Sequence, residues 1–242
     1  RLIRYPVLPI IKLIEKRTFS YASNINLISG GFKDYFKKYD HASFTFFTNG
    51  IDDEFLELKL PDSEINARPI ILYAGNIGEG QGLHKFVPQL AKKLENKFDF
   101  IVIGDGGAKQ KLIESIAELG CRNIDLKDPV SRTKLKEYYA KADYFLMHLN
   151  DFEAFKKVLP SKIFELAAMD KPIIAGVGGF AGRFVEEHVS NSILVNPCDF
   201  ETCANKLESY TYKRETRFDF VKKYRRDNIN TRMAESIKSV IL

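Results

Sequence analysis

Residues 69–106 have the sequence PIILYAGNIGEGQGLHKFVPQLAKKLENKFDFIVIGDG, and this stretch decides the fold. It contains an apolar run at 69–75, a segment with helical spacing of apolar residues at 83–97, and a second apolar run at 98–106. Apolar strands that alternate with helices are typical of a parallel sheet covered on both faces. The stretch therefore predicts a strand–helix–strand unit whose ligands bind beyond the carboxyl ends of the strands.

The same alternation continues along the chain. We expect further strands at 123–128, 143–149, 171–177 and 192–197, and helices at 108–120, 131–142, 161–170 and 182–190. The whole pattern predicts an α/β protein with a Rossmann-like doubly wound parallel sheet.

A less regular region precedes this pattern. It contains a helical segment at 8–21, a short strand at 26–29, a helix opened by Gly30 and Gly31, a strand and turn at 43–52, and a linker with two prolines at 59–69. We therefore divide the chain into three parts: the end of a preceding domain with the linker (1–60), the ligand-binding domain (61–207) and C-terminal helices (208–242). Because residue 1 is not methionine, we expect the chain to be part of a longer protein.

The bulk composition excludes several classes of protein. Of the 242 residues, 45% are hydrophobic and 29% are charged, which is ordinary for a globular protein. The net charge of +5 permits a phosphate-bearing partner but lacks the dense basic stripe of a nucleic-acid-binding protein, so we expect no nucleic-acid partner. The three cysteines show neither disulfide nor zinc spacing, which indicates free thiols in a reducing cytoplasm and no metal site.

One helix start carries an unusual set of polar residues. In LPSKIFELAAMDKPIIAGVGG (159–179), Pro160 and Ser161 open a helix, and Lys162 and Glu165 follow in its first turns. The simpler interpretation is an ordinary capped helix. However, the helix dipole disfavours a cation at Lys162, and a bound anion between the two would explain it. Glu165 could then accept hydrogen bonds from the vicinal hydroxyls of a ribose.

Three glycine-marked loops follow predicted strands on the same edge of the sheet. They contain Gly75, Gly78, Gly80 and Gly82; Gly104, Gly106 and Gly107; and Gly178 and Gly179. Such loops allow backbone amides to approach a phosphate, although each loop alone is equally typical of a tight turn. His148 ends a predicted strand at this edge, where a packed histidine is the simpler interpretation and a substrate contact the alternative.

These motifs together resemble the donor-binding domain of glycosyltransferase family 4, whose members have the GT-B fold. The resemblance covers about residues 27–207 and rests on LYAGNIGEGQGL, VIGDGGAKQKL, YYAKADYFLMHL, PSKIFELAAMDKPIIAGVGG and SILVNPCDFETCANKL. It is strongest to bacterial transferases of the N-acetyl-fucosaminyl type, which make O-antigen or capsule. The resemblance implies a UDP-sugar donor, a glycan or polyprenyl-linked acceptor, retention of anomeric configuration, no separate cofactor and no required metal.

The resemblance also implies roles for particular residues. Glu165 matches the second acid of the family's Glu-x7-Glu motif and would bind the ribose, whereas Lys162 would replace missing cations at the diphosphate; we treat these two as the candidate catalytic residues. The candidate donor-binding residues are Gly78, Gln81, Val130, Ser161, Lys162, Glu165 and Gly179. Of these, Val130 lies in the loop that would contact the base.

Three positions depart from the family pattern. Lys157 stands where the first acid of the motif is expected, and Asn76 and Gln81 stand where an arginine and a lysine commonly neutralise the diphosphate. We therefore expect this chain alone to bind nucleotide but to transfer little sugar. The alternatives are a non-catalytic nucleotide-binding module and a UDP-sugar epimerase of the same shape.

The first residues suggest a second kind of contact. Arg1, Arg4, Lys12, Lys16 and Arg17 flank apolar residues, as in a helix that lies at the cytoplasmic face of the inner membrane. The alternative, which we rank higher, is that this helix packs against another part of the protein.

Overall fold

Six parallel strands form the central sheet in the computed structural model, which describes residues 4–58, 60–61 and 64–241. The strands are β3 (Ile70–Ala74), β4 (Asp99–Ile103), β5 (Ile124–Lys127), β6 (Tyr144–His148), β7 (Ile173–Gly176) and β8 (Ser192–Val195). Their spatial order is β5-β4-β3-β6-β7-β8, so the chain reverses its direction of winding between β3 and β6. This order is that of a Rossmann fold, and it puts the switch point between β3 and β6.

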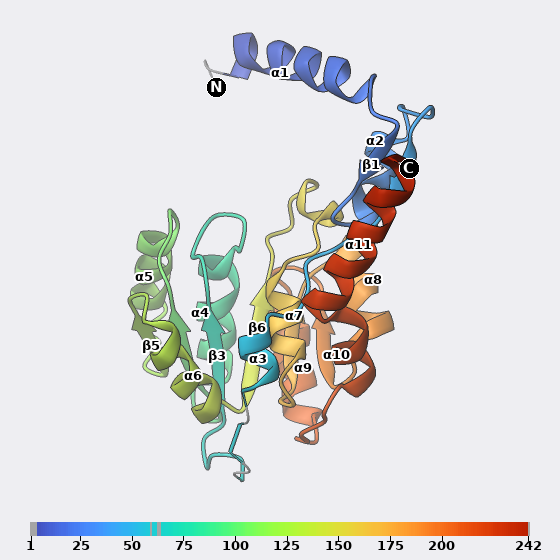
Figure 1. Cartoon of the computed structure of the whole chain (residues 1–242). Coiled ribbons are helices and arrows are strands. Elements are labelled where there is room, and N and C mark those ends of the chain that lie inside the picture. Colours follow the sequence, from blue (N-terminus) through green and yellow to red (C-terminus); the bar gives the residue numbers. More distant parts are fainter. Residues whose placement is uncertain (1–3, 59, 62–63, 242) are drawn as a thin grey trace.

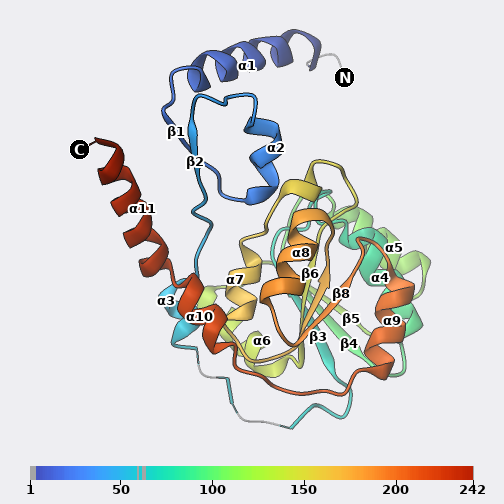
Figure 2. The ribbon, with the colours of Figure 1, turned by 90° about the vertical axis from the view of Figure 1, so that its right-hand side faces the viewer.

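Helices cover both faces of the sheet, as Figures 1 and 2 show. One face packs against α4 (Leu83–Lys93), α5 (Lys109–Glu118) and α9 (Phe200–Ser209), and the other against α6 (Arg132–Lys141), α7 (Lys162–Ala167), α8 (Gly179–His188) and α10 (Phe218–Tyr224). Alternate residues of β3 enter the two cores, Ile71 and Tyr73 on one side and Leu72 and Ala74 on the other. The predicted doubly wound α/β fold is therefore confirmed.

A small N-terminal unit precedes the sheet. It contains α1 (Arg4–Phe19), β1 (Asn24–Asn26), η1 (Gly30–Phe32), α2 (Lys33–Phe36) and β2 (Ser43–Thr45), and α3 (Asp53–Leu56) follows it. Strands β1 and β2 pair in parallel over a separate small core. The strand predicted at 26–29 begins two residues earlier, and residues 59 and 62–63 of the predicted linker lie outside the described residues.

Helix α1 extends away from the rest of the molecule (Figure 1). Its large apolar side chains are 40–66% exposed at Val7, Leu8, Ile10, Ile11, Leu13 and Ile14. Its contacts with the rest of the N-terminal unit include Glu15, which accepts hydrogen bonds from Lys38 and Tyr35, and Phe19, which packs on Phe36. None of the helices in the described residues has both the length and the apolar character needed to span a bilayer.

The C-terminal segment returns to the N-terminal unit through α11 (Arg226–Ile241). Ile51 and Arg225 form a parallel bridge, in which the Ile51 amide donates to the Tyr224 carbonyl at 2.8 Å. Arg217 is buried beneath the amino ends of β7 and β8, where it donates to backbone carbonyls of Met169, Lys171, Ser190 and Asn191.

Candidate functional site

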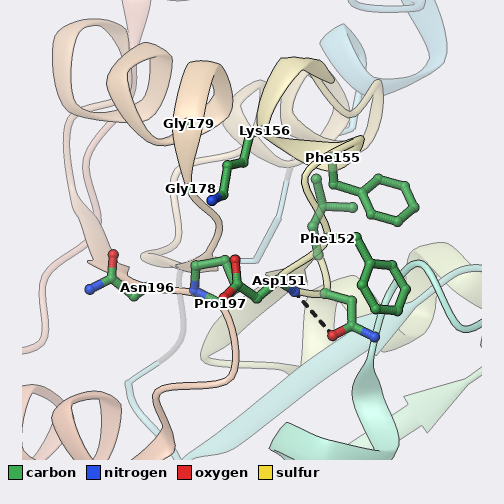
Figure 3. A pocket seen from close by; sticks show the side chains of 10 residues that line it. Asp151, Phe152, Phe155, Lys156, Gly178, Gly179, Asn196 and Pro197 are labelled. Atoms are coloured by element: carbon green, nitrogen blue, oxygen red, sulfur yellow. Dashed lines mark hydrogen bonds between the residues drawn. The ribbon is translucent and has the colours of Figure 1, made fainter.

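Two hollows lie at the carboxyl edge of the sheet. The first hollow, of about 370 Å³, is formed by the ends of β3 and β4, the loop before α6 and Lys162. The second hollow, also about 370 Å³, is formed by residues that follow β6, β7 and β8 (Figure 3). The first hollow is next to the switch point between β3 and β6, where ligands of such sheets bind.

The first hollow brings together two of the predicted site residues. Val130 comes from the loop between β5 and α6, and Lys162 comes from the first turn of α7. The end of β3 adds Gly75 and Asn76, and the end of β4 adds Asp105. An apolar wall at Val130 and a cation at Lys162 therefore face one cavity, which suits a ligand with a ring at one end and an anion near the other.

Helix α7 begins without a side-chain cap. Ser161 has helical backbone angles (φ −61°, ψ −27°), and its hydroxyl does not cap the helix. A capping serine normally has an extended backbone and accepts a hydrogen bond from an amide of the first turn. The interpretation of this stretch as an ordinary capped helix therefore does not account for Ser161.

Glu165 is held by two side chains. The Lys162 ammonium donates to one carboxylate oxygen at 2.8 Å, and the Tyr139 hydroxyl donates to the other. Burial raises the pKa of Tyr139, and so does the neighbouring carboxylate, so the phenol stays protonated and can act only as a donor to Glu165. Helical spacing at i and i+3 predicts the contact between Lys162 and Glu165. The helical spacing of Tyr139 indicates only a core residue, and it is buried, so nothing in the sequence marks it as a partner of Glu165.

The glycine-rich loop between β3 and α4 is closed by neutral hydrogen bonds. The side-chain oxygen of Gln81 accepts from the Gly78 amide at 3.2 Å and from the Asn76 side chain at 2.7 Å. Asn76 and Gln81 are the two positions at which the family resemblance predicts cations. In this chain they bond to each other, so these two positions present dipoles instead of positive charges.

The second hollow contains Gly179, which lies apart from the first hollow. Gly179 has a φ of +60°, and a Cβ atom there would lie 2.3 Å from the Lys156 carbonyl oxygen, so glycine is required. Figure 3 shows Lys156 above this hollow, opposite Asp151 and Asn196. The structure thus assigns Gly179 to a different cavity from Val130 and Lys162, and its role in donor binding stays a prediction.

Lys157 lies against the N-terminal unit. Its backbone carbonyl accepts a hydrogen bond from the Ser29 hydroxyl at 2.9 Å, and its ammonium lies 5.6 Å from the centre of the Tyr35 ring. Where the resemblance predicts an acid that contacts the sugar, this chain therefore has a residue that joins the two parts of the fold.

The strand order, the two-faced helical cover and the hollow at the switch point define a Rossmann-type α/β domain. Residues 57–227 match the model of the family described as glycosyl transferases group 1, and the chain belongs to that family.

Two curated proteins are similar to the chain in sequence. One, WcaI of Escherichia coli (strain K12), is assigned as a glycosyl transferase of colanic acid biosynthesis and is 32% identical over 143 residues, which are 58% of this chain and 34% of WcaI. The other, the sulfoquinovosyl transferase SQD2 of Arabidopsis thaliana, is 25% identical over 178 residues, which are 69% of this chain and 33% of SQD2. The matched region thus spans about a third of the length of these relatives.

Solved structures share the fold. HepE (Alr3699) of Anabaena, in complex with UDP and glucose, has a TM-score of 0.70 at 18% identity over 90% of this chain and 63% of that chain. Sucrose-phosphate synthase of Thermosynechococcus elongatus also has a TM-score of 0.70, at 16% identity over 95% of this chain and 61% of that chain. The predicted GT-B fold is confirmed by these likenesses.

Proposed function

We propose that the chain is the donor-binding portion of a retaining glycosyltransferase, which moves a sugar from a UDP-sugar to a glycan or polyprenyl-linked acceptor in surface-polysaccharide synthesis. The observation that carries the proposal is the first hollow, where Lys162 lies at the switch point and is paired with Glu165. Similarity to WcaI supports the link to surface polysaccharide, and the complex of HepE with UDP supports the choice of nucleotide. Its reaction would take place in the cytoplasm, where nucleotide sugars are made.

In this proposal, each residue has a defined task. The uracil ring packs at Val130, the ribose hydroxyls donate to Glu165, and the diphosphate accepts from Lys162 and from amides of the glycine-rich loop. The hydrogen bond from Tyr139 orients Glu165 and leaves lone pairs of the carboxylate for the ribose. Since Lys162 has three N–H donors and uses one on Glu165, it can still stabilise the charge that develops on departing UDP.

The departures from the family pattern limit the rate that we expect. Asn76 and Gln81 bond to each other and supply no cation to the diphosphate. A charge-assisted hydrogen bond is roughly twice as strong as a neutral one, so their absence weakens stabilisation of the leaving group. We therefore expect this chain to bind UDP and to transfer little sugar by itself. More specifically, we propose that the transferred sugar is of the N-acetyl-fucosaminyl type.

A non-catalytic binding module is the second candidate, and the same neutral pair of Asn76 and Gln81 favours it. A UDP-sugar epimerase of GT-B shape would differ in a simple way, since it would convert a UDP-sugar in the absence of an acceptor. Incubation of the chain with UDP-N-acetylglucosamine alone distinguishes the epimerase from the other two.

Calorimetric titration of UDP into the wild-type chain and Glu165→Ala tests the proposal. We expect UDP to bind the wild type in preference to GDP and NAD, and Glu165→Ala to weaken binding about tenfold or more, which corresponds to the loss of about 1.4 kcal/mol. Glu64→Ala, in the linker, is the matched control and should bind like the wild type.

Two results would count against the proposal. Absence of binding by any of the three nucleotides would leave the family resemblance as one of fold, and equal affinity of Glu165→Ala would remove Glu165 from the site. Robust sugar transfer by this chain alone would contradict the expected low rate.

A further inference from the structure

Residues at the carboxyl end of β6 hold the glycine-rich loop by hydrogen bonds to three consecutive carbonyl groups of that loop. The Asn150 side-chain amide donates to the Glu79 carbonyl at 2.8 Å, and the Asn150 backbone amide donates to the Gly80 carbonyl at 2.8 Å. The imidazole Nδ1 of His148 bonds to the third carbonyl, that of Gln81, at 2.6 Å. His148 and Asn150 are both 2% exposed or less, so all three contacts are buried at their β6 side.

His148 has a defined tautomer. Its Nε2 accepts a hydrogen bond from the Cys198 amide at 2.9 Å, so Nε2 carries no proton. Its Nδ1 must therefore carry the proton and donate to the Gln81 carbonyl, since a neutral imidazole has one donor and one acceptor. Burial lowers the pKa of His148 to about 4, which agrees with a neutral ring.

The surroundings hold the ring of His148 rigidly. It stacks on Phe86, with ring centres 4.3 Å apart. On the side of β7, Gly176 leaves the space that the ring occupies, because a Cβ atom at position 176 would lie 2.3 Å from His148 Cδ2. One imidazole thus ties the loops after β3 and β8 to the end of β6.

This arrangement decides which way the loop amides point. In a trans peptide the N–H group points opposite to the C=O group, so the Glu79 carbonyl, turned toward Asn150, turns the Gly80 amide away from β6. The Gln81 carbonyl, held by His148, shares its peptide with the Gly82 amide, which donates to the Gly78 carbonyl at 3.4 Å. The Gly78 carbonyl in turn shares its peptide with the Glu79 amide, so His148 helps to fix the direction of that amide. Within the described part of the chain, the amides of Glu79 and Gly80 have no hydrogen-bond acceptor in the protein. They are therefore the donors that this loop can offer to an anion.

We propose that His148 is a positioning residue for the donor diphosphate, and that it acts by fixing the Gln81 carbonyl so that the glycine-rich loop presents its amides to the ligand. This inference rests on the proposed function, since it concerns the same site. It adds a residue that touches neither substrate nor reacting atoms. Asn150 holds the same loop through its hydrogen bonds to the carbonyls of Glu79 and Gly80.

Three substitutions separate the two hydrogen bonds of His148. His148→Asn retains a donor near the position of Nδ1, His148→Gln retains an acceptor near the position of Nε2, and His148→Phe retains the ring without either. His41→Asn is the matched control, because His41 is an exposed histidine of the N-terminal unit. The readouts are calorimetric titration with UDP and hydrogen exchange of the amides at 79–82 in the whole chain.

We expect His148→Phe and His148→Gln to bind UDP about tenfold more weakly and to exchange the amides at 79–82 faster, since each loses the bond to Gln81. His148→Asn should stay within about threefold of the wild type, and His41→Asn should match it. Folding of each variant is checked by circular dichroism. If His148→Phe does not fold, the comparison of His148→Asn with His148→Gln still shows whether the hydrogen bond to the Gln81 carbonyl is needed for UDP binding.

Two different failures can be told apart. If the wild type binds UDP and the folded variants bind it equally, His148 has no positioning role and the proposed function stands. If the wild type binds no nucleotide, the proposed function fails and the inference about the diphosphate fails with it.

Discussion

At the residue scale, the carboxylate of Glu165, which is bonded to Lys162 of the first hollow, is held by two side chains. It accepts from both Lys162 and Tyr139, and these partners come from different helices. A carboxylate held from two sides loses little rotamer freedom when a ligand binds, so its contribution to affinity is larger than that of a mobile one.

Tyr139→Phe tests this constraint. The phenyl ring would keep its edge contacts with Phe55 and Phe145, whereas the hydrogen bond to Glu165 would be lost. We expect UDP affinity to fall about threefold to fivefold and the free energy of unfolding to fall by about 1 kcal/mol. Calorimetry and urea denaturation measure the two effects. Tyr138→Phe, one residue away, should change neither, and an unaltered affinity in Tyr139→Phe would show that Tyr139 does not orient Glu165.

The lowered pKa of His148 predicts a pH dependence of stability. An unfolded histidine titrates near pH 6.5, whereas burial lowers the pKa of folded His148 to about 4. Between these values the unfolded chain binds a proton that the folded chain does not, so the free energy of unfolding decreases as the pH falls. The expected loss from this group is about 2 kcal/mol between pH 7.5 and pH 5.

Urea denaturation of the wild type and His148→Asn at the two pH values checks this sign. The variant should lose about 2 kcal/mol less than the wild type over that interval, and His41→Asn should lose as much as the wild type. An equal loss in His148→Asn would mean that other groups cause the acid sensitivity.

At the element scale, α1 is apolar around most of its circumference. At 100° per residue, Leu8, Ile10, Ile11, Leu13 and Ile14 cover more than half of the helix, and the charged residues Glu15 and Arg17 fall within the same arc, so α1 has no separate charged face. A helix at a membrane surface has one apolar face and one charged face, whereas a helix that is apolar on most sides packs against protein. The arrangement of its side chains therefore favours a protein contact over a lipid contact for α1.

A chain that lacks residues 1–21 tests this preference. We expect it to sediment with liposomes of anionic lipid to the same small extent as the whole chain, and to bind UDP with unaltered affinity because the described contacts of α1 are with the N-terminal unit. Strong liposome binding by the whole chain that disappears on truncation would instead support the membrane role.

The sequence predicted the elements better than their contacts. Apolar runs revealed five of the six strands of the main sheet, because a buried parallel strand requires such a run. The edge strand β5, with the sequence IDLK and no buried residue, followed instead from the alternation of strands and helices. The pairing of Lys162 with Glu165 also follows from helical spacing. The bonds of His148 could not be predicted, since they join backbone atoms of Gln81 and Cys198, which lie 67 and 50 residues away in the sequence. Long-range contacts of this kind leave no periodic pattern.

At the scale of the whole molecule, Arg217 joins the C-terminal segment to the sheet. Its guanidinium donates to four backbone carbonyls before β7 and β8, and the side chain is nearly inaccessible to solvent. Two of these bonds, to the carbonyls of Met169 and Lys171, are buried, and a buried carbonyl that loses its partner is costly.

Arg217→Met should therefore lower the free energy of unfolding by about 3 kcal/mol or more. UDP affinity should not change at temperatures where the variant is folded, because Arg217 lies at the opposite end of the sheet from the first hollow. The urea midpoint and the calorimetric affinity measure the two effects, and Arg183→Met on α8 is a control for loss of charge. A midpoint within experimental error of the wild type would refute the anchoring role.

The contact between His148 and Gly176 also restricts how this protein can evolve. A side chain at position 176 would collide with the imidazole ring, so an alanine or serine there becomes acceptable only after a smaller residue has replaced His148. The reverse order passes through a strained intermediate. In descendants of this sequence, the two positions should accordingly change as a pair, with position 148 first.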